Sequence, residues 1–102
     1  MPVLHAALKS VTWYPFTPSN LANVPTASGV YWLGLNSRVI YIGSASNLNQ
    51  RLRDHYNRND PCIRKATQFA IDTCSNYRER ERQLLQAYRL KHGRLPECND
   101  QI

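Results

Sequence analysis

The stretch that decides the fold covers residues 29–43 and has the sequence GVYWLGLNSRVIYIG. Its two ends, residues 29–33 and 38–43, are rich in β-branched and aromatic residues, which fit the pleated surface of a sheet. Residues 34–37 between them contain the glycine, asparagine and serine that are typical of a turn. The pattern therefore predicts a β-hairpin.

The register of this hairpin decides whether Tyr31 and Tyr41 share a face, because side chains alternate along a strand. A regular two-residue turn would place the two phenols on opposite faces of the sheet. A three-residue loop or a single bulge would instead set Tyr31 opposite Gly43 and Leu33 opposite Tyr41. We predict the second arrangement, since the glycine and the polar residues of the turn tolerate irregular backbone.

The hydrophobic period changes after the hairpin. Leu48, Leu52 and Tyr56 recur every four residues, which predicts an amphipathic helix. Asn47 is a suitable N-cap for this helix. Residues 57–61 are polar and close with a proline, so the helix is expected to end there.

Two further elements complete the expected fold. Residues 68–73 alternate between apolar and polar side chains, as a half-buried strand does. A second helix is expected from about Tyr77 to His92, because Gly93 and Pro96 follow it. The order hairpin, helix, strand, helix predicts an α/β (α+β) fold with a small three-stranded antiparallel sheet flanked by helices.

The chain has 102 residues and a formal net charge of +6. This length suits one domain with one hydrophobic core, and we expect residues 1–102 to form it. All ten arginines lie from Arg38 onward, and arginine outnumbers lysine ten to three. Guanidinium groups match phosphate by their forked donors, so the distribution favours a nucleic-acid partner. The alternative is a basic, solvated surface that keeps the protein soluble.

Other classes of protein are disfavoured by what the sequence lacks. No apolar run approaches 18 residues, and the first residues do not resemble a secretory signal, so a cytoplasmic location is expected. Cys62, Cys74 and Cys98 are odd in number and widely spaced. We therefore predict reduced cysteines with no chemical role.

Five elements of the chain, taken together, resemble the GIY-YIG nuclease family. Gly29-Val30-Tyr31 and Tyr41-Ile42-Gly43 are similar to the two halves of the motif that names the family. The other three elements are Asn47-Leu48 with Arg51 and His55, Glu81 with Leu84 and Leu85, and the closing Pro96-Glu97-Cys98-Asn99. The resemblance covers roughly residues 25–99, and the joint order of the elements makes it specific.

The resemblance implies a small mixed α/β domain that hydrolyses phosphodiesters with one divalent metal ion, Mg²⁺ or Mn²⁺. By residue-wise match, Tyr31, Tyr41, Arg51 and His55 would be catalytic. Glu81 would be catalytic as well, as the residue that holds the metal. One departure is Ser44, which stands where the family's branch in bacterial nucleotide excision repair carries lysine.

The residue types suit this chemistry independently of the resemblance. Displacement at a phosphodiester gathers negative charge on the phosphoryl oxygens, and the forked donors of Arg51 can stabilise it. His55 lies four residues further on, so it leaves the helix on the same face and can transfer protons near neutral pH. Glu81 offers the hard oxygens that Mg²⁺ prefers. Tyr31 or Tyr41 would activate water only if nearby positive charge lowered its pKa.

Each of these residues also has a purely structural interpretation. Tyrosines are common in strands, and exposed arginines and lone histidines usually lie on solvated or packing surfaces. The two glutamates of the second helix are distinguished by position. Glu79 would form a capping box behind Asn76, whereas Glu81 would emerge beside the apolar stripe, at the rim of the buried face.

The sequence thus predicts a metal-dependent endonuclease that acts on nucleic acid, with DNA favoured over RNA by the resemblance. No helix-turn-helix or zinc finger is visible, so little intrinsic sequence specificity is expected. The alternatives are a non-cleaving nucleic-acid-binding module and a nuclease subunit of a larger assembly. Six residues are expected to contact nucleic acid: Arg51, Arg53, Arg58, Ser44, Asn47 and Asn99. For Asn99 the alternative is that it caps a turn.

Overall fold

The protein is an α+β fold built on one antiparallel sheet, seen in a computed structural model that describes residues 11–99. The elements in chain order are β1 (Tyr14–Pro15), α2 (Pro18–Leu21), β2 (Gly29–Leu35), β3 (Arg38–Ala45), α3 (Leu48–Asn57), η1 (Ile63–Lys65), β4 (Gln68–Thr73) and α4 (Tyr77–His92). The strand order is β1-β4-β2-β3, so β3 lies at an edge of the sheet. The expected fold class is confirmed.

The sheet has four strands, one more than the sequence predicted. The additional strand is β1, in which Tyr14 pairs with Phe69 and Pro15 with Gln68 of β4. It is only two residues long, and residues 11–14 had no periodicity that would separate a short edge strand from a loop. Proline suits such an edge position because it has no backbone donor.

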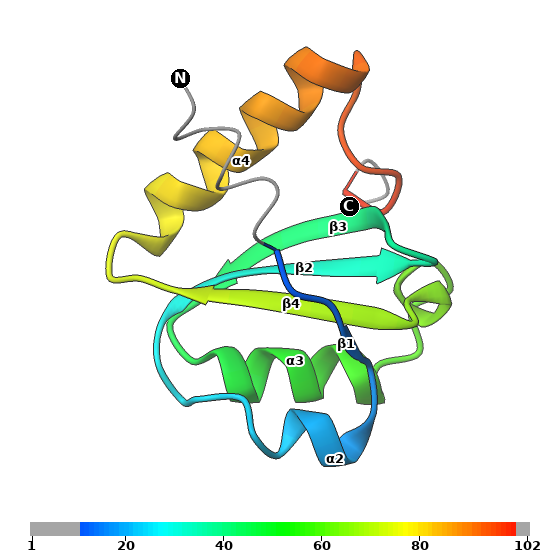
Figure 1. Ribbon diagram of the computed structural model, residues 1–102, viewed down its shortest axis with the longest axis vertical. Coiled ribbons are helices and arrows are strands. Elements are labelled where there is room, and N and C mark those ends of the chain that lie inside the picture. Colours follow the sequence, from blue (N-terminus) through cyan, green and yellow to red (C-terminus); the bar gives the residue numbers. More distant parts are fainter. Residues whose placement is uncertain (1–10, 100–102) are drawn as a thin grey trace.

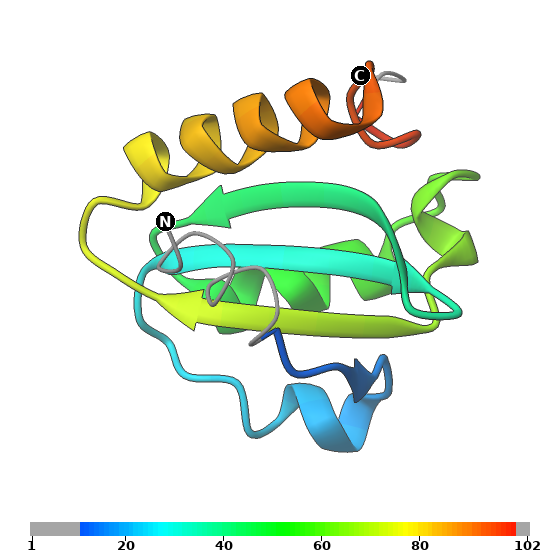
Figure 2. The ribbon, with the colours of Figure 1, turned by 45° about the horizontal axis from the view of Figure 1, so that its top comes forward.

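The helices cover the two faces of the sheet separately (Figure 1). Helices α2 and α3 lie on one face, and α4 crosses the other, as the tilted view also shows (Figure 2). Each face has its own core of buried side chains. Leu48 and Leu52 of α3 pack with Tyr31 and Leu33 on one side, whereas Leu84 of α4 packs against the opposite face.

The hairpin has the predicted register in its central part. Tyr31 lies opposite Gly43, and Leu33 lies opposite Tyr41. The irregularity is a bulge rather than a longer loop, because Gly34 then pairs with Val39 and the ladder skips one residue of β3. The bulge lets two consecutive residues of β3 contribute to the same core, which contains a fully buried isoleucine beside Tyr41.

The turn of this hairpin is a regular two-residue turn. Asn36 and Ser37 have φ values of 52° and 67°, the left-handed conformation that a tight hairpin requires at both positions. Of the two irregularities that the sequence left open, a three-residue loop and a bulge, the structure has the bulge, which accounts for the shared face. The local sequence did not distinguish the two, because both need flexible residues in the same place.

The caps of the two long helices differ from each other. The side chain of Asn47 accepts a hydrogen bond from the Gln50 amide at 3.0 Å, so its predicted role as N-cap of α3 is confirmed. At the start of α4, Asn76 makes no such bond. The predicted capping box of Glu79 is wrong, because its carboxylate instead accepts from Arg82 at 2.5 Å.

Two of the three cysteines form a disulfide, which corrects the prediction that all are reduced. Cys62 and Cys98 are 36 residues apart in sequence, yet their Cα atoms lie 5.6 Å apart. The fold brings the segment after α4 back across β3 to the turn before η1, a proximity that sequence spacing cannot reveal. Cys74 is a free cysteine. Within residues 11–99, no helix is long and apolar enough to cross a membrane.

Candidate active site at the edge strand

Tyr31, Tyr41 and His55 form an aromatic cluster on the face of the sheet that α3 covers. The Tyr31 hydroxyl and Nε2 of His55 are 2.7 Å apart, a hydrogen-bonding distance. The ring centroids of Tyr41 lie 6.1 Å from Tyr31 and 5.4 Å from His55. The hairpin register is what brings the two phenols together, and α3 adds the imidazole.

Gly43 makes room for this cluster. A Cβ atom at Gly43 would lie 2.5 Å from both Cζ and the hydroxyl oxygen of Tyr31. The Tyr31 ring therefore lies across the backbone of β3, directly over the residue that pairs with it. This packing role of Gly43 was not predicted from the sequence, because it depends on the register.

The phenols do not have the lowered pKa that the sequence analysis required of a water-activating tyrosine. Burial raises the pKa of the Tyr31 hydroxyl, and the neighbouring Tyr41 raises it further, against the opposing effect of Arg51. Burial also raises the pKa of the Tyr41 hydroxyl, and the negative charge of Glu81 raises it further. The hypothesis of a lowered phenol pKa is wrong here, because loss of hydration outweighs the charge of the arginine.

His55 is shifted in the direction that keeps it neutral. Burial lowers the pKa of its imidazole from 6.5 to about 4, and the positive charges of Arg51 and Arg58 act the same way. Its other ring nitrogen, Nδ1, is buried and makes no hydrogen bond within the described part of the chain. At neutral pH the imidazole can therefore accept a proton at one nitrogen.

Arg51 and Glu81 reach the site from opposite faces of the sheet, and Ser44 joins them. Nη1 of Arg51, on α3, donates to the backbone carbonyl of Ser44 at 3.2 Å. The Ser44 hydroxyl donates to Oε1 of Glu81, on α4, at 2.5 Å. Because β3 is an edge strand, groups from both faces can meet around it. The site thus surrounds the strand that carries Tyr41.

The donor set around Glu81 fits one weakly coordinated divalent cation. Residues 11–99 contain no group of three or more histidine, cysteine, aspartate or glutamate side chains that could enclose a metal ion. Mg²⁺ does not need such an enclosure, since it commonly keeps several waters and binds one or two carboxylates together with substrate phosphates. The Ser44 hydroxyl donates a hydrogen bond to Oε1 of Glu81. Oε2 of Glu81 makes no hydrogen bond within residues 11–99. Glu81 is therefore the residue suited to hold the ion.

The residues expected to contact nucleic acid fall into two groups. Arg51, Arg53 and Arg58 are exposed on α3 or at its end, with their charged groups near solvent. Ser44, Asn47 and Asn99 use their side chains within the protein. The Ser44 hydroxyl donates to Glu81. Asn47 caps α3, and Asn99 bonds to the backbone of β3.

Three contributors to the site region were not predicted from the sequence. The hydrogen bond from Ser44 to Glu81, the disulfide and the ion pairs of Glu97 all join elements that are far apart in the chain. The adjacency of Glu97, Cys98 and Asn99 in sequence was visible. Their partners were not, because local patterns carry no information on which segment returns to β3.

Comparison with known proteins points to one family. The family model of the GIY-YIG catalytic domain matches residues 28–94. The UvrABC system protein C of Fusobacterium nucleatum is 44% identical over 36 residues, which cover 35% of this chain and 6% of that protein. The corresponding protein of Caldicellulosiruptor saccharolyticus is 46% identical over 41 residues, covering 39% of this chain and 7% of that protein.

A solved structure extends the likeness to three dimensions. It is the N-terminal GIY-YIG endonuclease domain of UvrC from Thermotoga maritima, bound to its catalytic divalent cation, magnesium. It superposes with a TM-score of 0.60 at 28% identity, covering 70% of this chain and 88% of that domain. The chain therefore matches nearly the whole of a solved domain, although it spans under a tenth of the curated relatives' length.

Proposed function

The chain belongs to the GIY-YIG family, and on that premise we propose that it is a metal-dependent endonuclease that hydrolyses phosphodiester bonds of DNA with little intrinsic sequence specificity. The observation that carries the proposal is the convergence of five side chains on edge strand β3. They are Tyr31, Tyr41, Arg51, His55 and Glu81. The chain spans only 6% and 7% of the curated relatives, so its activity is argued from this site.

The Tyr31–His55 pair would carry the proton of the attacking water. Because the imidazole is neutral, its Nε2 can accept the Tyr31 proton across the 2.7 Å contact while the phenol oxygen takes one from water. The resulting hydroxide equivalent attacks phosphorus and displaces the leaving oxygen of the backbone. In this arrangement the phenol never has to exist as a free anion, which its raised pKa disfavours.

Arg51 and Glu81 would handle the negative charge of the phosphate. One guanidinium nitrogen of Arg51 is held by the Ser44 carbonyl, which fixes the group and leaves other donors for phosphoryl oxygens. Glu81 would hold a divalent cation, whose charge stabilises the developing charge on the phosphate and the leaving oxygen. Tyr41 lies close enough to both groups for their charges to act on its pKa, and it would bind a phosphate oxygen by its hydroxyl.

Two observations support DNA as the substrate and a low sequence specificity. The structurally similar protein is named as an endonuclease domain of UvrC, and the curated relatives are named as UvrABC system proteins. The net charge of +6 supports binding to the phosphate backbone, which carries no sequence information. Within residues 11–99 we find no separate helix pair for reading a groove.

The test is a cleavage panel on duplex, branched and single-stranded DNA and on RNA. Each substrate is incubated with Mg²⁺, with Mn²⁺ or with a chelator, and products are resolved on a denaturing gel. We expect cleavage of DNA that requires the metal and varies little with sequence. Gel retardation of DNA without cleavage under any metal would overturn the proposal in favour of a binding module.

A further inference from the structure

The segment after α4 adds an outer row of hydrogen bonds to the edge strand that carries Tyr41. The Cys98 amide donates to the Ile40 carbonyl at 2.8 Å. The Asn99 carboxamide makes two bonds to Ile42: it accepts from the amide at 3.0 Å and donates to the carbonyl at 2.9 Å. Tyr41 lies between the two residues that are held in this way.

These bonds replace a missing neighbouring strand. Successive residues of an antiparallel strand direct their backbone groups to opposite sides, so Ile42 points away from β2 while Tyr41 and Gly43 point toward it. The outward groups of an edge strand normally bond to water. Here the side-chain carboxamide of Asn99 bonds to both the amide and the carbonyl of Ile42. Together with the bond from Cys98 to Ile40, it restrains the backbone on either side of Tyr41.

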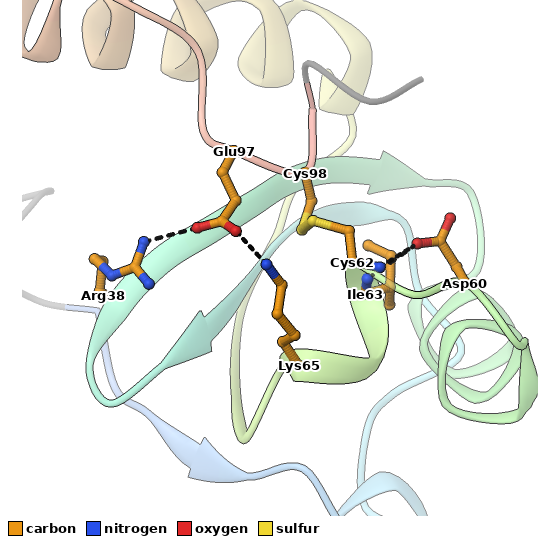
Figure 3. A network of polar contacts seen from close by, with 7 residues as sticks. All are labelled: Arg38, Asp60, Cys62, Ile63, Lys65, Glu97 and Cys98. Carbon is orange, nitrogen blue, oxygen red and sulfur yellow. Dashed lines mark hydrogen bonds and ion pairs between the residues drawn. A yellow bond between two sulfur atoms is a disulfide. The ribbon is translucent and has the colours of Figure 1, made fainter.

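The four residues 96–99 contain no helix or strand, so something else must hold them in place. Figure 3 shows two sets of contacts that hold the segment, the ion pairs of Glu97 and the disulfide of Cys98. Glu97 forms ion pairs with Arg38 at 2.8 Å and with Lys65, and the hydrogen bonds that Lys65 and Arg38 donate lower its pKa to about 2. Cys98, which is 1% exposed, is joined covalently to Cys62.

The other end of the disulfide is itself well anchored. Cys62 lies at the start of η1, where Oδ1 of Asp60 accepts from the amides of Cys62 at 2.9 Å and Ile63 at 3.0 Å (Figure 3). Ile63 is buried in the core cluster that also contains Leu48 and Leu52 of α3. The covalent bond therefore ties the C-terminal segment to a rigid point and not to a loose loop.

We propose that residues 96–99 form a redox-sensitive latch, in which the Cys62–Cys98 disulfide and Glu97 hold Asn99 against Ile42 and thereby position Tyr41 for cleavage. The effect on cleavage rests on the proposed function, whereas the effect on the backbone of β3 does not. Glu97 and the two cysteines are positioning residues, since none of them reaches the reacting atoms. The ion pairs alone are too exposed to keep the latch closed.

The latch opens by thiol–disulfide exchange with a dithiol reductant. A thiolate of the reductant attacks one sulfur and forms a mixed disulfide, and its second thiol then displaces the protein sulfur. Cys62 and Cys98 become two thiols, and the reductant is oxidised to its own disulfide. Because both cysteines are buried, attack requires the segment to lift from β3. In the cytoplasmic location expected from the sequence, reducing conditions would favour the open latch.

The decisive measurement is amide hydrogen exchange of Ile42 in the full chain, followed by NMR. Three samples are compared: the oxidised protein, the same protein reduced with dithiothreitol, and the doubly substituted Cys62→Ser/Cys98→Ser variant. We expect Ile42 to exchange at least about tenfold faster in the last two, because its protection comes from Asn99. The amide of Gly43, which points toward β2, should change much less. Cys74→Ser is the matched control and should behave as the oxidised protein does.

Cleavage is measured on the same samples under saturating metal. We expect opening of the latch to lower kcat while KM for DNA changes little, since the basic surface is untouched. If Ile42 responds to reduction but no sample cuts DNA, the latch stands and the proposed function fails. Asn99→Ala serves as the fully open reference. If that variant exposes Ile42 but reduction does not, or if the chain still alkylates at three free thiols after incubation in an oxidising glutathione buffer, the latch is wrong.

Discussion

The Tyr31 hydroxyl lies 2.7 Å from Nε2 of His55, and burial shifts the pKa of both groups away from their charged forms. The pair is therefore neutral at physiological pH and can exchange a proton without creating a stable ion in the ground state. A proton relay of this kind needs close contact more than a lowered phenol pKa. The geometry of the hairpin and α3 provides that contact.

The first prediction concerns the pH dependence of cleavage. His55 loses its acceptor nitrogen only when it is protonated, and its pKa is lowered from 6.5 to about 4. We expect the acid limb of the kcat/KM profile to follow this lowered value. Steady-state cleavage rates between pH 4 and pH 8 would measure it. An acid limb centred near 6.5 would show that the imidazole is not shielded as the structure indicates.

The same shift makes stability depend on pH. Between about pH 6.5 and pH 4 the unfolded chain binds a proton at His55 and the folded chain does not, so stability must fall as the pH falls through this window. Urea unfolding at several pH values would show the decline. The His55→Gln variant should lack this part of it, and an identical pH dependence in both proteins would contradict the assignment.

The second prediction concerns Glu81. Replacing it by glutamine keeps the size of the side chain but removes the charge that would hold the cation. We expect Glu81→Gln to lose cleavage and most Mn²⁺ affinity, while retaining its fold and its binding to DNA without metal. Glu79→Gln is the matched control, because Glu79 lies two residues away and pairs with exposed Arg82. Greater loss in the control would mean that the wrong carboxylate was chosen.

The third prediction separates a specific arginine from the general basic surface. Arg51→Ala should lower kcat by about 100-fold or more, as expected for a donor to developing charge. Arg58→Ala and Arg94→Ala should mainly weaken DNA binding, with a smaller dependence of affinity on salt. Single-turnover rates and salt titrations of the three variants would distinguish these effects. Equal loss of turnover in all three would remove the specific role of Arg51.

The fourth prediction tests the packing of Tyr31 over β3. In Gly43→Ala the new methyl would lie 2.5 Å from the phenol, so the ring must move and the contact with His55 is lost. We expect a strong loss of cleavage and about 1–3 kcal/mol lower stability. Gly93→Ala is the control: its φ of 79° makes alanine cost about 1 kcal/mol, with open space around it and activity unchanged. Full activity in Gly43→Ala would refute the packing argument.

Much of the fold followed from local patterns. The strands on either side of Asn36, the helix from Leu48 and the helix up to Gly93 were predicted because propensity, period and caps are short-range properties. Even the shared face of Tyr31 and Tyr41 could be predicted from the sequence, because side chains alternate along a strand and this restricts the register. Two details were not: which irregularity sets that register, and the pairing of Tyr14 with Phe69.

The candidate site could be predicted from the sequence only as a set of residue types in a specific order. The sequence by itself determined that two tyrosines, an arginine, a histidine and a glutamate are present at the spacing of the family. Only the tertiary structure decided that Glu81 approaches β3 from the opposite face and that Asn99 and Cys98 close its edge. It also decided the protonation of the site, because the pKa of Tyr31 depends on burial by distant segments, which no local pattern encodes.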